Sequence, residues 1–195
     1  MSKKISVLMG IYNCADTLEQ AVASIRNQTY KDWELILCDD GSSDNTFEVA
    51  QKLAAEEPRI ILLRNDGNKG LNTTLNNCLA AATGEYVARM DGDDDCLPER
   101  FEKQITFLEK HPEFQITSCP MILFDENGEW GETHVPEQPT AEDVVCGTAI
   151  SHAPMMMYRE CMTSVGGYAV IQKQLMQTDC RYMLLQIIFL IGLED

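Results

Sequence analysis

The sequence lacks several features that would point to particular functions. It contains neither a GxxxxGK[ST] loop nor a GxGxxG fingerprint, so both common devices for holding phosphates on backbone amides are missing. Basic residues are also few, because 15 Lys and Arg stand against 31 Asp and Glu and give a net charge of −16. Nucleic acids and anionic membranes repel such a chain unless a metal or a basic patch intervenes. We therefore expect no nucleic-acid partner.

Paired cysteines and a leader segment are missing as well. The eight cysteines are scattered without any CxxC pair, which predicts free thiols rather than a zinc site or a disulfide framework. The start, MSKKISVLMGIYN, has no long apolar region followed by a cleavage site, and it is typical of a first strand. These features predict a cytoplasmic protein without a signal peptide.

The chain of 195 residues, 45% of them hydrophobic, suits one domain with a real core. Strand patterns are present at 5–11, 33–38, 59–64 and 85–90. Four helices are predicted. The first starts at Asp16 or Thr17, the second starts at Ser43 or Asp44, the third covers 71–82, and the fourth runs from Pro98 to about residue 110. Further along, 114–124 predicts one long strand before a turn at 125–128, and the run 155–158 predicts a buried strand. This alternation predicts an α/β fold, with a Rossmann-like, mostly parallel sheet in the order 3-2-1-4 and helices on both faces.

Two groups of carboxylates follow predicted strands. Asp39 and Asp40 end the second strand, and the sequence DGDDD at 91–95 ends the fourth. A parallel sheet binds ligands outside the carboxyl ends of its strands, and carboxylates gathered there repel one another unless a cation joins them. The ligand spacing of an EF-hand is absent, whereas Mg²⁺ or Mn²⁺ is commonly held by one or two carboxylates plus substrate phosphates. A divalent metal site is therefore the functional interpretation of DGDDD, and a solvated acidic loop is the alternative.

The segment DDGSSDNT also has a purely structural interpretation. Gly41 and Ser42 can turn the chain, and Ser43 or Asp44 can accept amide hydrogens from the following helix. That interpretation leaves the Asp39–Asp40 pair unexplained. One of these carboxylates could accept the imide hydrogen of a uracil ring or a ribose hydroxyl.

Several segments together resemble the family 2 inverting glycosyltransferases, which have a GT-A fold. They are, in order, ISVLMGIYN, QTYKDWELILCDDGSSDNT, NKGLNTTLNNCLAAATGEYVARMDGDDDCLPERF, SHAPMMMYR and VGGY, and the resemblance covers about residues 4–180. It implies a single GT-A domain over 1–195, with a nucleotide-binding part at about 1–124 and an incomplete acceptor-side part at about 125–195. It also implies metal-dependent transfer of a sugar from a UDP-sugar to a hydroxyl acceptor, a saccharide or glycolipid, in surface polysaccharide or glycolipid synthesis.

The resemblance assigns roles to residues on the donor side. Tyr12, with Asn13 beside it, would lie against the uracil. Asp39 would hydrogen-bond the imide, and Asp40 would help to shape the pocket. Lys69 could approach the nucleotide, although it also fits an exposed loop lysine.

The family's DxD motif resembles Asp91-Gly92-Asp93. By this resemblance Asp93 would bind Mn²⁺ or Mg²⁺, Asp91 would face the ribose or sugar and contribute to the metal site, and Asp94 would be a further metal ligand. His152 in SHAPMMMYR would contact the donor phosphates or the acceptor. From the residues alone, His152 equally fits a core or turn histidine.

The acceptor side departs from the family pattern. The family's Glu-Asp pair after the GGY segment corresponds to Thr178-Asp179, so Asp179 is the candidate catalytic base, and a helix cap is its alternative role. The apolar run 182–193 is shorter than the roughly 20 residues of a membrane span. Such a run can pack on the core, pair with another subunit in a homo-oligomer, or represent a truncated or altered reading of a longer protein. Peripheral association with the inner face of a membrane is a further alternative, which the absence of basic residues in the run disfavours. The missing Glu also leaves open a truncated, inactive protein that binds a nucleotide sugar.

Overall fold

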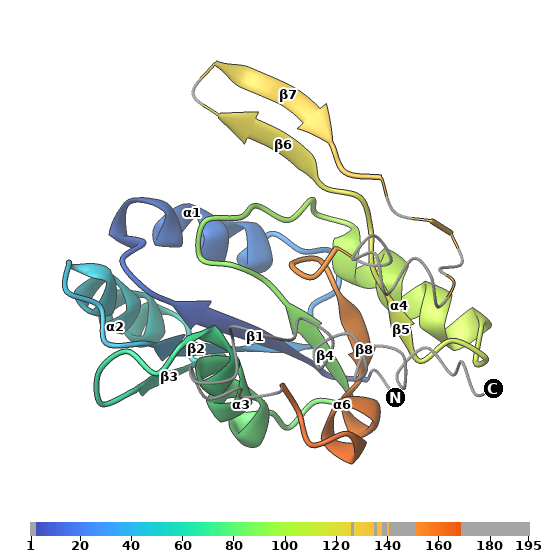
Figure 1. The fold of residues 1–195 in the computed structure, drawn as a ribbon, viewed down its shortest axis with the longest axis horizontal. Helices are drawn as coiled ribbons and strands as arrows, with labels where there is room; N and C mark the ends of the chain where they lie inside the picture. The colour runs from blue at the N-terminus through green and yellow to red at the C-terminus, as the bar shows by residue number, and fades with distance from the viewer. Residues whose placement is uncertain (1–2, 126, 135, 138–139, 141–150, 169–195) are drawn as a thin grey trace, which may run out of the picture.

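A six-stranded sheet in the order β3-β2-β1-β4-β8-β5 forms the centre of the fold (Figure 1). The computed structural model describes residues 3–125, 127–134, 136–137, 140 and 151–168. The strands of this sheet are β1 (Ile5–Ile11), β2 (Trp33–Asp39), β3 (Ile60–Arg64), β4 (Tyr86–Arg89), β5 (Ile116–Thr117) and β8 (Met156–Tyr158). The first four strands pair in parallel, and β8 runs antiparallel to both β4 and β5. The predicted order 3-2-1-4 and the mostly parallel sheet are confirmed.

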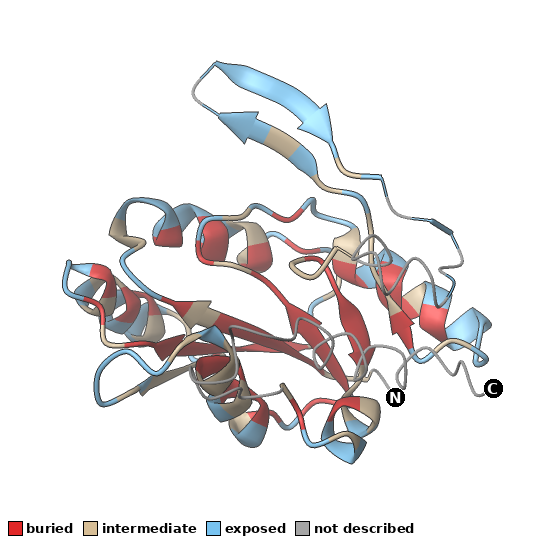
Figure 2. Cartoon of the chain, in the orientation of Figure 1, coloured by how far each residue is buried: buried red, intermediate tan, exposed pale blue. Residues whose placement is uncertain are grey.

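Helices cover both faces of the sheet, as predicted (Figure 1). They are α1 (Ala15–Arg26), α2 (Thr46–Glu56), α3 (Leu71–Ala81), α4 (Arg100–Lys110) and α6 (Arg159–Ser164). Apolar side chains of α1, α2 and α4 form one core cluster with alternate strand residues such as Val7 and Met9. The intervening strand residues, such as Leu8 and Ile36, face a second cluster with α3 and α6. The central strands are therefore buried on both sides, which explains why they are almost continuously apolar (Figure 2).

One polar network is buried inside this sheet. Ser6 Oγ donates to Glu34 Oε1 over 2.6 Å, the backbone amide of Thr83 donates to the same oxygen over 2.7 Å, and Lys4 Nζ donates to Oε2. Burial alone would raise the pKa of Glu34, but the hydrogen bonds from Lys4, Ser6 and Thr83 outweigh it and lower the pKa to about 2. The network joins β1, β2 and the chain before β4.

Element boundaries differ from the predictions in a few places. Helix α1 begins at Ala15, so Asp16 and Thr17 lie inside its first turn rather than at its cap. Helix α2 begins at Thr46 with Asn45 at its cap position, rather than at Ser43 or Asp44. Asp44 Oδ1 accepts the amide hydrogen of Thr46 over 3.0 Å, as predicted. Pro98 lies before the first residue of α4.

The predicted strand at 114–124 is wrong. It divides into β5 and a separate strand β6 (Ile122–Asp125), with Pro120 between them. Proline has no amide hydrogen to donate to a sheet, which accounts for the break. Among the described residues strand β6 pairs only with β7 (Gly128–Glu132), and Asp125 pairs with Gly128 at the two ends of the predicted turn. The buried strand predicted in the methionine run is β8.

The described cysteines meet a further expectation, whereas the apolar run 182–193 lies outside the described residues. All six described cysteines are free thiols, namely Cys14, Cys38, Cys78, Cys96, Cys119 and Cys161. Cys146 and Cys180 lie outside the described residues. In the described part of the chain, no helix has the length and hydrophobicity that crossing a bilayer requires.

Candidate active site

The loops after β1 and β2 are joined by hydrogen bonds at the carboxyl edge of the sheet. Asn13 has a positive φ of 49°, a conformation that asparagine adopts more readily than most residues. Its backbone amide donates to Ser42 Oγ over 3.0 Å, and its Oδ1 accepts the amide hydrogen of Ser43 over 2.9 Å. Beside it, Tyr12 leaves 48% of its surface exposed. The two loops therefore present Tyr12 and Asn13 at the same edge as the Asp39–Asp40 pair.

Asp39 is the last residue of β2, and its side chain is completely buried. Arg64 Nε, at the end of the neighbouring strand β3, lies 3.1 Å from Asp39 Oδ2. The amide of Ser42 donates to the same carboxylate over 3.3 Å, and the Arg64 guanidinium lies 4.0 Å from the centre of the Phe47 ring. Arg64 therefore covers Asp39, and a ligand that hydrogen-bonds the Asp39 carboxylate has to displace it.

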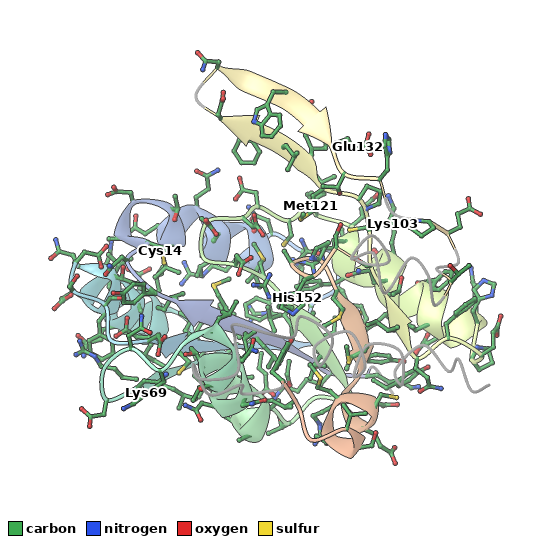
Figure 3. The ribbon with its side chains drawn as sticks, in the orientation of Figure 1. Cys14, Lys69, Lys103, Met121, Glu132 and His152 are labelled. Atoms are coloured by element: carbon green, nitrogen blue, oxygen red, sulfur yellow. The ribbon has the colours of Figure 1, made fainter. Side chains whose placement is uncertain are left out.

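Asp40 organises the loop between β3 and α3. Its Oδ1 accepts the amide hydrogen of Lys69 and the Asn65 side chain, each over 2.8 Å, and its Oδ2 accepts the amide hydrogen of Gly70 over 2.9 Å. Burial alone would raise the pKa of Asp40, but these hydrogen bonds outweigh it and leave the pKa lowered. Lys69 contributes its backbone to this arrangement, while its exposed side chain lies at the outer edge of the molecule (Figure 3).

The first carboxylate of the acidic loop has a partner that the sequence analysis did not single out. Arg89, the last residue of β4, donates from both terminal nitrogens to the carboxylate of Asp91, with Nη1 2.6 Å from Oδ2. The Arg89 side chain is only 5% exposed, and that of Asp91 is 31% exposed. The one signal for Arg89 in the sequence is a charged residue in an otherwise apolar strand, YVAR.

Gly92 lies where the acidic loop packs against the beginning of α1. A Cβ atom at this position would lie 2.9 Å from Cys14 Sγ and 3.1 Å from Ile11 Cγ2. The carbonyl oxygen of Gly92 accepts the Thr17 hydroxyl over 2.8 Å. A side chain at the middle position of Asp91-Gly92-Asp93 would therefore have to displace Cys14 or Ile11.

The remaining carboxylates of the loop are close enough to repel one another. Asp93 is exposed, whereas Asp94 is partly buried. Burial, followed by the charges of Asp91 and Asp93, raises the pKa of Asp94. Hard oxygen donors that crowd one another in this way suit Mg²⁺ or Mn²⁺. Within the described residues no three acidic, His or Cys side chains are placed to hold a metal by themselves.

A buried amide fixes the far end of the acidic loop. Gln28 follows α1 and has no exposed surface. Its Nε2 donates to the carbonyl oxygens of Leu97, over 2.8 Å, and Cys96, over 3.3 Å, and its Oε1 accepts the amide hydrogen of Phe101 over 3.0 Å. These contacts join residues 68 to 73 positions apart, and no local pattern in the sequence indicates them.

His152 lies in the segment before β8 (Figure 3). Burial and then the charge of Arg89 lower its pKa to about 4, so the imidazole is neutral near pH 7. Its ring meets that of Tyr168 edge to face, with the ring centres 5.7 Å apart. Asn76 of α3 exchanges two hydrogen bonds of 2.8 Å with the backbone of Tyr168 and so ties the VGGY segment to the core.

Apart from His152, the predicted site residues that the structure describes lie at one edge of the sheet, at or after the ends of β1, β2, β3 and β4. This edge carries Tyr12, Asn13, Asp39, Asp40 and the acidic loop. His152 lies before β8, close enough to Arg89 at this edge for the charge of Arg89 to lower its pKa. Asp179, the predicted catalytic base, lies outside the described residues.

The chain thus has a mostly parallel α/β sheet with acidic loops at its carboxyl edge, the edge where such sheets bind ligands. The sequence profile of glycosyl transferase family 2 matches residues 6–174, and the chain belongs to that family. Its fold is GT-A. A mannosyltransferase, PcManGT of Pyrobaculum calidifontis in complex with GDP-Man and Mn²⁺, aligns with a TM-score of 0.68 at 19% identity, covering 87% of this chain and 48% of that one. S. aureus TarS 1–349 in complex with UDP-GlcNAc also gives 0.68 at 19% identity, covering 85% and 48%.

Curated relatives are longer than this chain. The putative glycosyltransferase EpsE of Bacillus subtilis is 45% identical over 171 residues, which is 87% of this chain and 62% of EpsE. WfaP of Escherichia coli, a UDP-Glc:α-D-GlcNAc-diphosphoundecaprenol β-1,3-glucosyltransferase, is 37% identical over 110 residues, which is 56% of this chain and 43% of WfaP. The chain therefore spans less than two thirds of either relative.

Proposed function

We propose that the protein transfers a sugar from a UDP-sugar to a hydroxyl acceptor with inversion at the anomeric carbon, in the synthesis of a surface polysaccharide or glycolipid. The observation that carries this proposal is the convergence of the Tyr12, Asp39 and Asp91 loops at one carboxyl edge, the edge where α/β sheets bind nucleotides. Family membership supports the reaction class. The names of relatives such as WfaP and AmsE, an amylovoran biosynthesis glycosyltransferase, support the pathway type.

In this proposal the base of the nucleotide lies against Tyr12 and hydrogen-bonds Asp39. The exposed ring of Tyr12 provides a flat surface at the site, and the Asp39 carboxylate can accept an imide hydrogen. Arg64 has to move away from Asp39 when the base binds, because the two side chains form an ion pair at the carboxylate that the base would contact. Asp40 keeps the β3–α3 loop, with Lys69, beside the nucleotide.

Asp93 and Asp94 would hold Mg²⁺ or Mn²⁺ together with the donor diphosphate. When bound, the metal neutralises the charge of the leaving diphosphate. Asp91 remains paired with Arg89 and faces the ribose or sugar with the part of its carboxylate that is exposed. A neutral His152 can donate a hydrogen bond to a phosphate or accept one from an acceptor hydroxyl. Asp179 removes the proton from that hydroxyl as it attacks the anomeric carbon.

Calorimetry with UDP, GDP and CMP, each with and without Mn²⁺, tests the donor site. We expect Mn²⁺ to strengthen UDP binding most and the Asp93→Ala variant to lose this dependence. Asp95→Ala is the matched control, because Asp95 belongs to the same loop but pairs with Gln20 of α1. Metal-independent binding, or equal effects of the two substitutions, would contradict the assignment.

A second candidate is a protein that binds the nucleotide sugar without transferring it. The observation that favours it is Thr178, which stands where the family pattern has a Glu beside the candidate base. UDP release from a panel of UDP-sugars, compared between the native protein and Asp179→Asn, separates the two functions. Release that depends on Asp179 supports transfer. Tight UDP binding without any release supports the inactive binder.

A further inference from the structure

The β6–β7 hairpin stands clear of the sheet and its helices (Figures 1 and 2). Among the described residues its strands pair only with each other, yet three large apolar side chains remain exposed on it: Ile122 at 48%, Phe124 at 54% and Trp130 at 65%. A two-stranded hairpin is marginally stable alone in water. Exposed apolar residues clustered on one element also mark binding surfaces more often than isolated ones do.

The register places these residues together. Ile122 and Phe124 are two residues apart on β6, so their side chains share one face. The pairing passes from Leu123 opposite Gly131 to Phe124 opposite Glu129, which leaves Trp130 as the extra residue of a bulge. Glu129 therefore opposes Phe124 and Glu132 opposes Ile122, while Trp130 lies in the bulge directly after Glu129. We call Ile122, Phe124, Glu129, Trp130 and Glu132 the hairpin face.

The charge of the hairpin restricts its partner. The sequence from 111 to 158 contains no Lys or Arg, and Asp125, Glu129 and Glu132 all lie on the hairpin. These carboxylates repel an anionic bilayer, and a second copy of a chain with net charge −16 would be repelled as well. A neutral, hydroxyl-rich ligand fits better, because carboxylates accept hydrogen bonds from hydroxyls and aromatic rings provide flat apolar surface.

The base of the hairpin is attached to the segment that carries His152. Met121 and Thr133 exchange backbone and side-chain hydrogen bonds of 2.8 Å where the two strands leave the body. Thr133 Oγ1 lies 3.3 Å from Ser151 Oγ, and the Ser118 hydroxyl donates to the Ser151 carbonyl oxygen over 2.7 Å. Ser151 directly precedes His152 in the sequence. The hairpin is thus anchored to the segment through which His152 approaches the site.

We propose that the hairpin face binds the saccharide part of the acceptor, with sugar rings against Trp130 and Phe124 and their hydroxyls on Glu129 and Glu132. The inference rests on the proposed glycosyl transfer. It adds a binding surface for neutral sugar units that lie beyond the hydroxyl receiving the new sugar.

Tryptophan fluorescence offers a direct test. The chain has two tryptophans, and Trp33 is 1% exposed whereas Trp130 is 65% exposed, so a quencher dissolved in water reports on Trp130. The probes are three neutral oligosaccharides: laminaritetraose, cellotetraose and N-acetylchitotetraose. We expect at least one to protect Trp130 from quenching. We expect Phe124→Ala to weaken that binding about fivefold, the loss of roughly 1 kcal/mol of aromatic contact. Phe107→Ala, an exposed aromatic on α4, is the matched control and should leave binding unchanged.

Three results would overturn the proposal. The first is that none of the oligosaccharides protects Trp130. The second is protection by phosphatidylcholine vesicles alone, which would indicate a membrane surface. The third is self-association of the protein that Trp130→Ala abolishes, which would indicate a second copy as the partner. Calorimetry with UDP and Mn²⁺ in parallel separates this proposal from the donor site: UDP binding without saccharide binding removes only the hairpin role, and saccharide binding without UDP binding removes only the donor assignment.

Discussion

Arg89 and Asp91 form a bidentate ion pair where β4 ends and the acidic loop begins. The guanidinium is buried, whereas the carboxylate is partly exposed. Asp91 thereby compensates a charge that the interior cannot solvate, while Asp93 two residues later is exposed to solvent. The two acids of the DxD pattern therefore have different structural roles before any ligand binds.

The pair predicts unequal effects of two similar substitutions. Asp91→Ala leaves the buried Arg89 uncompensated and should lower the free energy of unfolding by about 3 kcal/mol. Asp93→Ala should change it by no more than about 0.5 kcal/mol, because an exposed side chain is removed. Urea unfolding of both variants without metal measures the difference. Equal losses of stability would show that Arg89 does not depend on Asp91.

Glu34 predicts how stability depends on pH. Its pKa is about 2 in the folded protein, below the roughly 4.3 of an unfolded chain. The stabilisation is therefore complete above the unfolded pKa and is lost as the pH falls through 4 toward 2. A difference of about two pKa units corresponds to about 3 kcal/mol.

Glu34→Gln removes this dependence. The variant should be less stable than the native protein at pH 7, and the gap between them should narrow as the pH falls from about 5 to 3. Urea unfolding across this pH range is the measurement. Glu129→Gln, on the exposed hairpin, is the control. A gap that stays constant with pH would mean that the hydrogen bonds from Lys4, Ser6 and Thr83 do not favour the charged form.

Gly92→Ala tests how closely the acidic loop packs on the β1–α1 loop. The added methyl group lies within 2.9 Å of Cys14 Sγ, so the loop has to shift, at a cost of about 1–3 kcal/mol. We expect weaker Mn²⁺-dependent UDP binding in calorimetry. Removing the sulfur in the double variant Cys14→Ala/Gly92→Ala should restore only part of the affinity, because Ile11 Cγ2 remains close. If the losses of affinity from the two substitutions simply added, contact between the new methyl group and Cys14 would not be the cause of the weaker binding.

The strand order and the position of both acidic clusters could be predicted because they depend on local patterns. Apolar runs of strand length alternate with helical periodicity, and Asp39 and Asp91 follow such runs directly. Short right-handed crossovers then leave few arrangements of the strands. The strand expected at 114–124 is not continuous, because Pro120 interrupts a segment that is otherwise apolar enough to form a strand.

The contacts that shape the site could not be predicted in the same way. Arg64 covers Asp39 and Asn13 bonds Ser43, yet these partners are 25 and 30 residues apart and meet only because β1, β2 and β3 are neighbours in the sheet. Their identities follow from side-chain geometry after folding. Arg89 is different, since a lone arginine at the end of a buried strand and two residues before Asp91 is a local signal.

Gln28 offers the sharpest test of how the acidic loop is held. Gln28→Leu keeps a similar volume but leaves the amide of Phe101 without its Gln28 partner and removes the second hydrogen bond to the carbonyl oxygen of Leu97, which still accepts the amide hydrogen of Arg100. We expect a cost of about 1–3 kcal/mol, mostly from the Phe101 amide. We expect reduced stability in urea and weaker Mn²⁺-dependent UDP binding, with UDP binding in the absence of metal little changed. Gln20→Leu, an exposed glutamine that bonds Asp95 of the same loop, is the matched control.

Gln28→Glu tests the donor role of the Gln28 side chain separately from its acceptor role. The carboxylate of the variant can still accept the hydrogen of Phe101 N, but it faces the carbonyl oxygens of Cys96 and Leu97 without a hydrogen to donate. Protonation of that carboxylate recovers one donor, so the variant should regain stability relative to the native protein as the pH falls, the reverse of the trend expected from Glu34. Unfolding of this variant between pH 7 and pH 4 measures the effect. A stability difference from the native protein that does not change over this range would mean that donation from Gln28 to the loop carbonyls contributes little.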